Sequence, residues 1–343
     1  KNSPDSAIGP KEPRRTWKWK SDVPIPTYNM VIGAAEMDIT TLGIANFAYS
    51  EASPRTDGSI EVSNWTFPED TEKSRPSFTR AADMVNFFAT RIGPYPYEKL
   101  ANVQSSTRFG GMENASAIFY SQSAIAKGRN IESTVSHEIA HQWFGDSVTE
   151  KEWHHLWLSE GFATYFGALF FEQSDGADSF KKRMEKNKDR IIKSKATDRP
   201  IVDYEVNDLF KLLNSNNYPK GAWVLHMLRG LVGDELFFKG ISKYYSIYKD
   251  KTVLTDDFSA IMEEVSGLDL QYFFDQWIFS PGYPIIEIEQ NWISKNNGNN
   301  KMIITINQVQ KKKWPTFIFQ SELCWGDNKC MPIKIDQKTQ SFD

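Results

Sequence analysis

The sequence predicts an α+β fold, and three observations support this prediction. Extended segments at residues 29–66 and 100–120 flank one amphipathic helix, residues 78–92. Helical patterns then dominate to about residue 279, and strand-like alternation returns after Pro284. Strands followed by a run of helices are typical of α+β domains rather than of repeated βαβ units.

The helical patterns follow one another closely after residue 130. They cover residues 131–145, 157–173, 177–194, 219–231, 234–248, 255–266 and 269–279. In the first of them Ile131, Val135, Ile139 and Trp143 recur at intervals of four, which indicates one buried face.

The last part of the chain has the pattern of a small β domain. Hydrophobic and polar residues alternate in residues 285–293, 302–309 and 317–323, and an Asn-rich turn at 296–300 separates the first two. Short alternating runs separated by turn residues are typical of β sandwiches. We therefore expect a small β sandwich after the helices.

Composition limits the classes of partner. The chain has 343 residues, 40% of them hydrophobic, and a formal charge of −4, so it can bury a large core and gives no support for a nucleic-acid partner. No apolar stretch approaches the roughly twenty residues of a membrane span, so we expect a soluble chain. Its first residues lack the layout of a signal peptide. The sequence gives no oligomeric state.

A possible metal site is the most informative feature. His137, Glu138 and His141 form an HExxH motif, and eighteen residues separate His141 from Glu160. Histidines four positions apart on a helix share one face, where both imidazoles reach one metal ion. Zinc in catalytic sites takes three protein ligands and a water. Glu160 is the natural third ligand, because a carboxylate within an apolar run needs a cation. We predict one zinc ion per chain.

Glu138 has a different role in this pattern. It directly follows the first histidine, so its carboxylate points off the ligand axis yet can take a proton from a zinc-bound water. We therefore predict Glu138 as the general base. Asp146, just past this helix, is a candidate hydrogen-bond partner for an imidazole N–H.

Three segments resemble the M1 zinc aminopeptidases, the gluzincin group that includes aminopeptidase N and leukotriene A4 hydrolase. They are HEIAHQWFGD from His137 with LSEGFATY around Glu160, FGGMEN from Phe109 to Asn114, and NYPKGA from Asn217 to Ala222. The resemblance covers nearly the whole chain. It implies a thermolysin-like catalytic fold and the removal of N-terminal residues from peptides.

The resemblance also implies roles for individual residues. In the family the loop that matches FGGMEN forms an edge strand along the substrate, and its glutamate binds the free α-amino group. The corresponding substrate-binding residues are Gly110, Gly111, Met112, Glu113 and Asn114. Such an anionic anchor would hold an ammonium group and so place the first peptide bond at the metal. The family usually has alanine where Gly111 stands, a departure that leaves the role intact.

Tyr218 is the second catalytic residue that the resemblance implies. It matches the tyrosine whose phenol donates a hydrogen bond to the tetrahedral oxyanion. A donor aimed at developing negative charge commonly contributes a few kcal/mol of transition-state stabilisation. Glu138 and Tyr218 are therefore the predicted catalytic pair.

The chain matches only part of the family's architecture. Residues 1–35 resemble the end of an N-terminal β domain, 36–284 the thermolysin-like catalytic domain, and 285–343 a small β-sandwich domain. Nothing in the sequence can supply the large helical domain that follows in many members. Because the flanking domains complete the amine anchor and wall off the site in the family, we expect zinc binding with weak or altered peptidase activity from this chain.

Two cysteines, Cys324 and Cys330, bracket a predicted hairpin turn. A disulfide and two free thiols are both compatible with this spacing. A disulfide would favour an extracytoplasmic location.

The leading functional prediction is a zinc metallo-aminopeptidase that acts on peptides with a free N-terminus. A thermolysin-like endopeptidase is one alternative, although it would not need Glu113. A catalytically weak zinc-bearing scaffold is the other, although it would have no use for Glu138.

Overall fold

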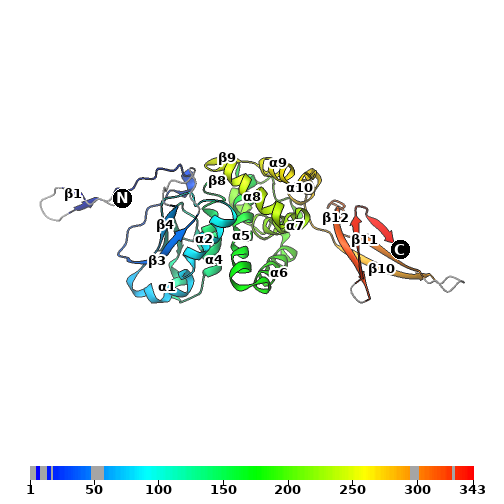
Figure 1. Cartoon of the computed structure of the whole chain (residues 1–343), viewed down its shortest axis with the longest axis horizontal. Coiled ribbons are helices and arrows are strands. Elements are labelled where there is room, and N and C mark those ends of the chain that lie inside the picture. The colour runs from blue at the N-terminus through cyan, green and yellow to red at the C-terminus, as the bar shows by residue number, and fades with distance from the viewer. Residues whose placement is uncertain (1–4, 8–13, 17, 48–57, 294–300, 327–328) are drawn as a thin grey trace. The chain divides into compact units, whose positions relative to one another are not determined.

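The computed structural model describes residues 5–7, 14–16, 18–47, 58–293, 301–326 and 329–343. The chain divides into two compact units. The first is Lys1–Ser147 with Lys249–Lys251, and the second is Val148–Tyr248 with Thr252–Asp343. Helices and strands are both abundant, which confirms the mixed content that the sequence predicts (Figure 1).

A five-stranded sheet forms the first unit. Its strands are β3 (Asp38–Asn46), β4 (Ser59–Thr66), β5 (Leu100–Ser105), β6 (Gly111–Met112) and β7 (Ala117–Ser121), in the order β3-β4-β5-β7-β6. The three inner strands are parallel and the two outer strands antiparallel to their neighbours. Strand β5 is buried along nearly its whole length, as expected for a strand covered on both faces. The short strand β6 therefore lies at an edge.

Four helices accompany this sheet. They are α1 (Thr71–Phe78), α2 (Ala81–Arg91), α3 (Gln122–Ala126) and α4 (Glu132–His141). Helix α2 packs on β3 and on α4, and α1 packs on β4 and on α4. The rings of Phe88 and Trp143 meet edge to face at 5.7 Å between centroids, so the segment just after α4 is fixed to α2.

Two predicted helices differ from the observed ones in the first unit. The helix expected over residues 78–92 begins only at Ala81, because Arg80 leaves the helical conformation and separates α2 from α1, which ends at Phe78. The Arg80 guanidinium instead binds both carboxylate oxygens of Glu132 at the start of α4, at 2.6 and 2.8 Å. The helix expected over 131–145 ends already at His141, and tight turns follow it.

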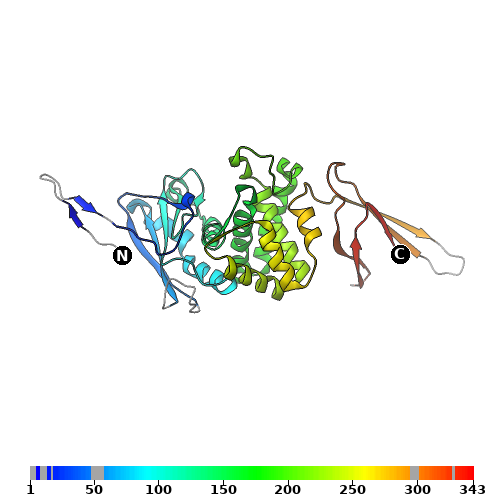
Figure 2. The same cartoon turned by 90° about the horizontal axis from the view of Figure 1, so that it is seen from above.

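The second unit begins with a bundle of helices. They are α5 (Trp157–Asp175), α6 (Ala177–Lys193), α7 (Gly221–Val232), α8 (Asp234–Tyr248), α9 (Thr255–Ser266) and α10 (Gln271–Trp277). Helix α5 is hydrophobic on all sides and contacts both α6 and α7. Figures 1 and 2 show these helices together in green to yellow. A π-helical turn, η6 (Asn216–Lys220), leads into α7 and contacts α5.

The other elements before residue 280 are short strands and 3₁₀ turns. The remaining strands before residue 280 are β1 (Asp5–Ala7), β2 (Arg14–Thr16), β8 (Val148–Glu150) and β9 (Lys251–Val253). The 3₁₀ turns are η1 (Thr27–Asn29), η2 (Pro68–Asp70), η3 (Trp153–His155), η4 (Lys195–Asp198) and η5 (Leu209–Leu212).

Two small sheets follow the bundle. Strands β10 (Ile286–Ile293), β11 (Lys301–Gln308) and β14 (Thr339–Phe342) form one, and β12 (Phe319–Trp325) pairs with β13 (Lys329–Ile335) in the other. Both sheets contribute to one apolar cluster around Ile306, Ile333 and Ile335. The predicted alternation of β10 does not bury a face, because β10 is an edge strand outside this cluster and all its residues are exposed. The predicted turn at 296–300 lies outside the described residues.

Cys324 and Cys330 face each other across β12 and β13 and form a disulfide. The structure thus selects one of the two states that the sequence leaves open. Among the described residues, no helix is both long and apolar enough to cross a membrane.

The predicted domain bounds of 1–35, 36–284 and 285–343 remain predictions. The division into units falls between Ser147 and Val148, which is inside the range we predict as the catalytic domain.

Candidate active site

The two histidines of the HExxH motif lie at the C-terminal end of α4, where their rings meet. Their Nε2 atoms are 3.0 Å apart, and His141 is buried. Nδ1 of His141 lies 3.0 Å from the carbonyl oxygen of Phe144. Because a carbonyl only accepts hydrogen bonds, Nδ1 carries the proton, and the lone pair of Nε2 is directed toward the neighbouring imidazole.

The side chain of Glu138, a residue of α4, lies beside Gly111 of the edge strand β6. Its side chain is buried, and a Cβ atom placed on Gly111 would lie within 2.5 Å of the Glu138 Cγ and Cδ atoms. Only glycine therefore leaves room for this carboxylate in its present position. Burial, followed by the negative charge of Glu138, raises the pKa of Tyr120 well above its ordinary value.

The GGMEN segment, Gly110–Asn114, runs along the same side of α4. Gly111 and Met112 pair with Tyr120 and Phe119 of β7, and the chain then turns through Glu113. Ligand atoms of Glu113, Glu138 and His141 all lie within 4.8 Å of one another. The first unit thus brings together the predicted anchor, the predicted base and one predicted metal ligand.

Glu160 and Tyr218 meet in the second unit. Glu160 is in the first turn of α5 and is only 7% exposed, and the Tyr218 hydroxyl donates a hydrogen bond of 2.5 Å to its Oε1. Two glycines allow this approach: a Cβ on Gly161 would lie 3.0 Å from the Gly221 Cα and 3.2 Å from the Asn217 carbonyl oxygen. Larger residues would separate α5 from η6 and so separate the two side chains.

His137, His141 and Glu160 each offer one ligand atom, and as a group they could hold a metal ion. A second group of this kind, Glu322 with Cys324 and Cys330, is exposed on the β12–β13 hairpin. Its two sulfur atoms are joined in the disulfide and offer no thiolate. The third group, Glu113 with Glu138 and His141, has only one histidine, so His137, His141 and Glu160 are the candidate metal centre among the described residues.

Sequence patterns missed a polar network beside this centre. Gln142 donates to the Asp146 carboxylate at 2.8 Å, and Asn29 donates to it at 2.5 Å. Our predicted imidazole bond to Asp146 is not the one that orients His141, whose Nδ1 binds the Phe144 carbonyl. Burial, followed by the charge of Glu113, raises the pKa of Asp146 well above its usual range. The sequence signal that could have pointed to this network is the position of Gln142, a polar residue directly after the predicted metal ligand His141.

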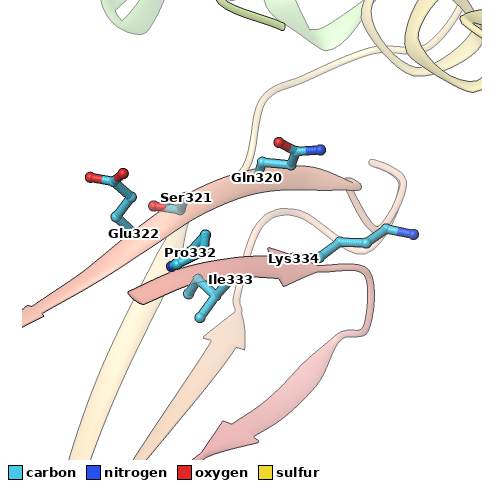
Figure 3. A pocket seen from close by; sticks show the side chains of 6 residues that line it. All are labelled: Gln320, Ser321, Glu322, Pro332, Ile333 and Lys334. Carbon is cyan, nitrogen blue, oxygen red and sulfur yellow. The ribbon is translucent and has the colours of Figure 1, made fainter. Parts of the chain in front are cut away.

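An open depression on the β12–β13 hairpin lies on different elements from the candidate site. Its lining residues are Gln320, Ser321, Glu322, Pro332, Ile333 and Lys334 (Figure 3). None of the predicted site residues is among them, and the lining contains no histidine.

Comparisons with known proteins decide the family. The model of the peptidase family M1 domain matches residues 77–277, which is more than half of the chain and includes every predicted catalytic and ligand residue. The chain belongs to peptidase family M1.

Curated M1 relatives are longer than this chain. Leucine aminopeptidase 2 of Ajellomyces capsulatus is 29% identical over 81% of this chain and 45% of its own length. Probable aminopeptidase 2 of Sulfurisphaera tokodaii is 30% identical over 82% of this chain and 40% of its own. The chain thus spans less than half of these relatives.

Solved M1 structures have the same fold. The M1 zinc metallopeptidase of Deinococcus radiodurans matches with a TM-score of 0.67 and 22% identity, over 83% of this chain and 62% of that one. Legionella pneumophila aminopeptidase A, in complex with aspartic acid, matches with a TM-score of 0.74 and 18% identity, over 96% of this chain and 38% of that one. These matches support the M1 fold of the chain.

Proposed function

We propose that this chain is the catalytic part of a zinc aminopeptidase that removes N-terminal residues from peptides. The observation that carries the proposal is the meeting of Glu113, Glu138 and His141 in one corner of the first unit. An amine anchor, a base and a metal ligand in such proximity fit exopeptidase chemistry. The aminopeptidase names of the curated relatives point the same way.

We propose that one zinc ion binds His137, His141 and Glu160. The donor set suits zinc, because imidazole and carboxylate are common ligands of catalytic zinc sites. The separation of 3.0 Å between the two Nε2 atoms is also close to the roughly 3.3 Å expected for two nitrogen ligands of one tetrahedral zinc ion. When bound, zinc supplies Lewis acidity, which lowers the pKa of a water molecule and polarises a carbonyl.

Glu138 acts in this proposal as the general base. Its carboxylate is buried beside the imidazole of His141 and borders the edge strand. From there it would take the proton of the attacking water and pass it to the leaving amine. Burial favours this role, because it excludes competing solvent from the carboxylate.

Tyr218 stabilises the oxyanion in this proposal. Its hydroxyl donates to Glu160 in the structure, so the phenol proton already points at a carboxylate oxygen. A rotation of the side chain would direct the same proton to the oxyanion that develops on the scissile carbonyl.

Glu113 with the GGMEN segment holds the substrate. The carboxylate would pair with the α-ammonium of the peptide, and the edge of β6 would align the peptide backbone. Pairing of this kind restricts cleavage to the first peptide bond. We therefore propose peptides with a free N-terminus as the substrates.

The test compares aminoacyl p-nitroanilides that have a free amine with the same compounds after N-acetylation. Cleavage of the free compounds alone supports an aminopeptidase. Cleavage of both classes at similar rates would instead favour the endopeptidase. No cleavage of either class by the zinc-loaded chain would contradict the proposed activity.

Two further assignments belong to this proposal. We propose that residues 285–343 form a small β sandwich, because the two sheets share the cluster around Ile306, Ile333 and Ile335. We also propose an oxidising compartment, because the Cys324–Cys330 disulfide is exposed to solvent and would be reduced by cytosolic thiols.

A further inference from the structure

The side-chain amide of Gln142 has four polar partners. Its Nε2 donates to the Glu113 carbonyl oxygen at 2.9 Å and to the Asp146 carboxylate at 2.8 Å. Its Oε1 accepts from the Ser116 backbone N–H at 2.8 Å and lies 3.1 Å from the Tyr95 hydroxyl, whose single proton is shared with the Lys99 carbonyl oxygen. Gln142 directly follows the predicted metal ligand His141.

The partners fix which end of this amide is oxygen and which is nitrogen. The backbone N–H of Ser116 can only donate, so it requires the oxygen. The carbonyl of Glu113 can only accept, so it requires the nitrogen. The amide therefore has one stable orientation, and a flipped orientation would lose both bonds to the backbone.

These two backbone bonds span the Glu113–Ser116 turn. The turn is tight: the Ala117 N–H donates to the Asn114 carbonyl at 3.0 Å, and Ser116 has a φ of 65°. A positive φ is unfavourable for a residue with a Cβ atom, so the surroundings must hold Ser116 in it. Gln142 supplies one of the bonds that do so.

Asn29 and Asp146 form further hydrogen bonds to residues that hold the same turn. The Asn29 amide donates to Asp146, and the Asn114 side-chain amide donates to the Asn29 carbonyl at 3.2 Å. Asn29, Asn114, Gln142 and Asp146 are all buried. The Oδ1 atoms of Asn29 and Asn114 have no partner among the described residues, but the named donors of these amides all have an acceptor, and such buried bonds resist displacement.

We propose that Gln142 is the positioning residue of the amine anchor, and that Asp146 and Asn29 hold its amide in place. The inference rests on the proposed function of Glu113. Gln142 ties the backbone of Glu113 to the C-terminal end of α4. The position of the anchoring carboxylate relative to His141 is thereby fixed. The register of the peptide at the cleavage centre then depends on this amide, although all four partners of the Gln142 side chain are groups of the protein itself.

The test measures the contribution of the substrate amine directly. Calorimetry on the zinc-loaded chain gives the affinities of L-leucine hydroxamate and of 4-methylpentanohydroxamate, which lacks only the α-amine. The ratio of the two dissociation constants reports the amine anchor. In Gln142→Met, which keeps a similar volume, we expect the ratio to fall about tenfold because the anchor loses its fixed place. The zinc content should not change.

Two further variants make the result specific. Asp146→Asn retains the volume but removes one acceptor of the network, so the ratio should fall about threefold, and this variant serves as the test if Gln142→Met does not fold. Tyr95→Phe removes a bond to Gln142 without touching the turn, and it should leave the ratio within about twofold. A fall in Tyr95→Phe as large as in Gln142→Met would overturn the inference.

The outcomes separate the inference from the proposed function. If the wild-type chain binds both hydroxamates equally, Glu113 does not anchor an amine, and the proposed function is wrong. If the wild type prefers the amine but Gln142→Met and Asp146→Asn keep the full preference, only the positioning role of Gln142 is wrong.

Discussion

The Tyr218 hydroxyl donates a hydrogen bond of 2.5 Å to Oε1 of Glu160, so the predicted oxyanion donor and the predicted third metal ligand are directly linked. The two side chains come from η6 and α5, and the close approach of Gly161 and Gly221 brings those elements together. The bond keeps the phenol aimed at one carboxylate. It also gives Tyr218 a part in orienting Glu160 besides its proposed catalytic role.

Replacing Tyr218 with phenylalanine tests this catalytic role. The variant keeps the ring and loses the hydroxyl, so we expect turnover to fall by about a hundredfold to a thousandfold, as for other lost oxyanion donors. The zinc content should remain that of the wild type, because Glu160 retains its carboxylate. Steady-state kinetics with elemental analysis measures both.

Tyr204→Phe is the matched control for that variant. Its hydroxyl bonds to the His155 ring in the same unit, and its side chain is exposed. Its turnover should stay within about twofold of the wild type. Near-native turnover in Tyr218→Phe would remove the hydroxyl from the mechanism.

Adding one methyl group at Gly111 should shift the Glu138 side chain without removing the general base. A Cβ there would overlap the Glu138 side chain, which has to move from its present position. The overlapping atoms are the outer part of a flexible side chain, and alanine is the usual residue at this position in the family that the segment resembles, so we expect Gly111→Ala to keep kcat within about threefold of the wild type. Gly230→Ala is the control, since a Cβ at Gly230 meets nothing within 4 Å. A fall in kcat of about a hundredfold in Gly111→Ala alone would show that Glu138 acts as a base only from its present position.

Lys220 should make stability depend on pH. Its side chain is buried, its Nζ has no hydrogen-bond partner among the described residues, and burial lowers its pKa from 10.5 to about 7. Between these two values the unfolded chain holds the proton and the folded chain does not. The free energy of unfolding therefore rises with pH in this window, by about 1.4 kcal/mol per pH unit from this group.

Lys220→Met removes the ionisable group and hence this slope. Urea denaturation at pH 7 and pH 9 should show a smaller rise in the variant than in the wild type, with the variant the more stable at pH 7. Lys211→Met is the control, because the Lys211 side chain is 75% exposed. The same pH slope in Lys220→Met and wild type would show that Lys220 remains charged in the fold.

The sequence predicted the helices that carry the candidate site residues better than the buried side chains packed around those residues. The spacing of His137 and His141 on a helix required no tertiary information, because the helical period alone puts them on one face. The extent of most helices in the second unit followed from the apolar period, and α5 begins where it was expected. Helix ends were less predictable: α4 stops at His141, where tertiary contacts of Trp143 override its helical pattern.

The polar network around Gln142 could not be predicted in the same way. Asn29 and Asn114 lie far from Gln142 in the sequence, and no periodic pattern marks amides that become buried partners in the fold. The conflict between Gly111 and a Cβ atom likewise depends on where Glu138 lies. Such features follow from tertiary packing, which periodicity does not report.

The central claim is that Glu138 is a base beside a zinc ion and does not bind it, whereas Glu160 does. Elemental analysis of purified wild type, Glu138→Gln and Glu160→Gln tests this claim most directly. The account predicts about one zinc per chain in the wild type and in Glu138→Gln, and a value well below one in Glu160→Gln. Loss of zinc from Glu138→Gln, or full zinc in Glu160→Gln, would contradict it.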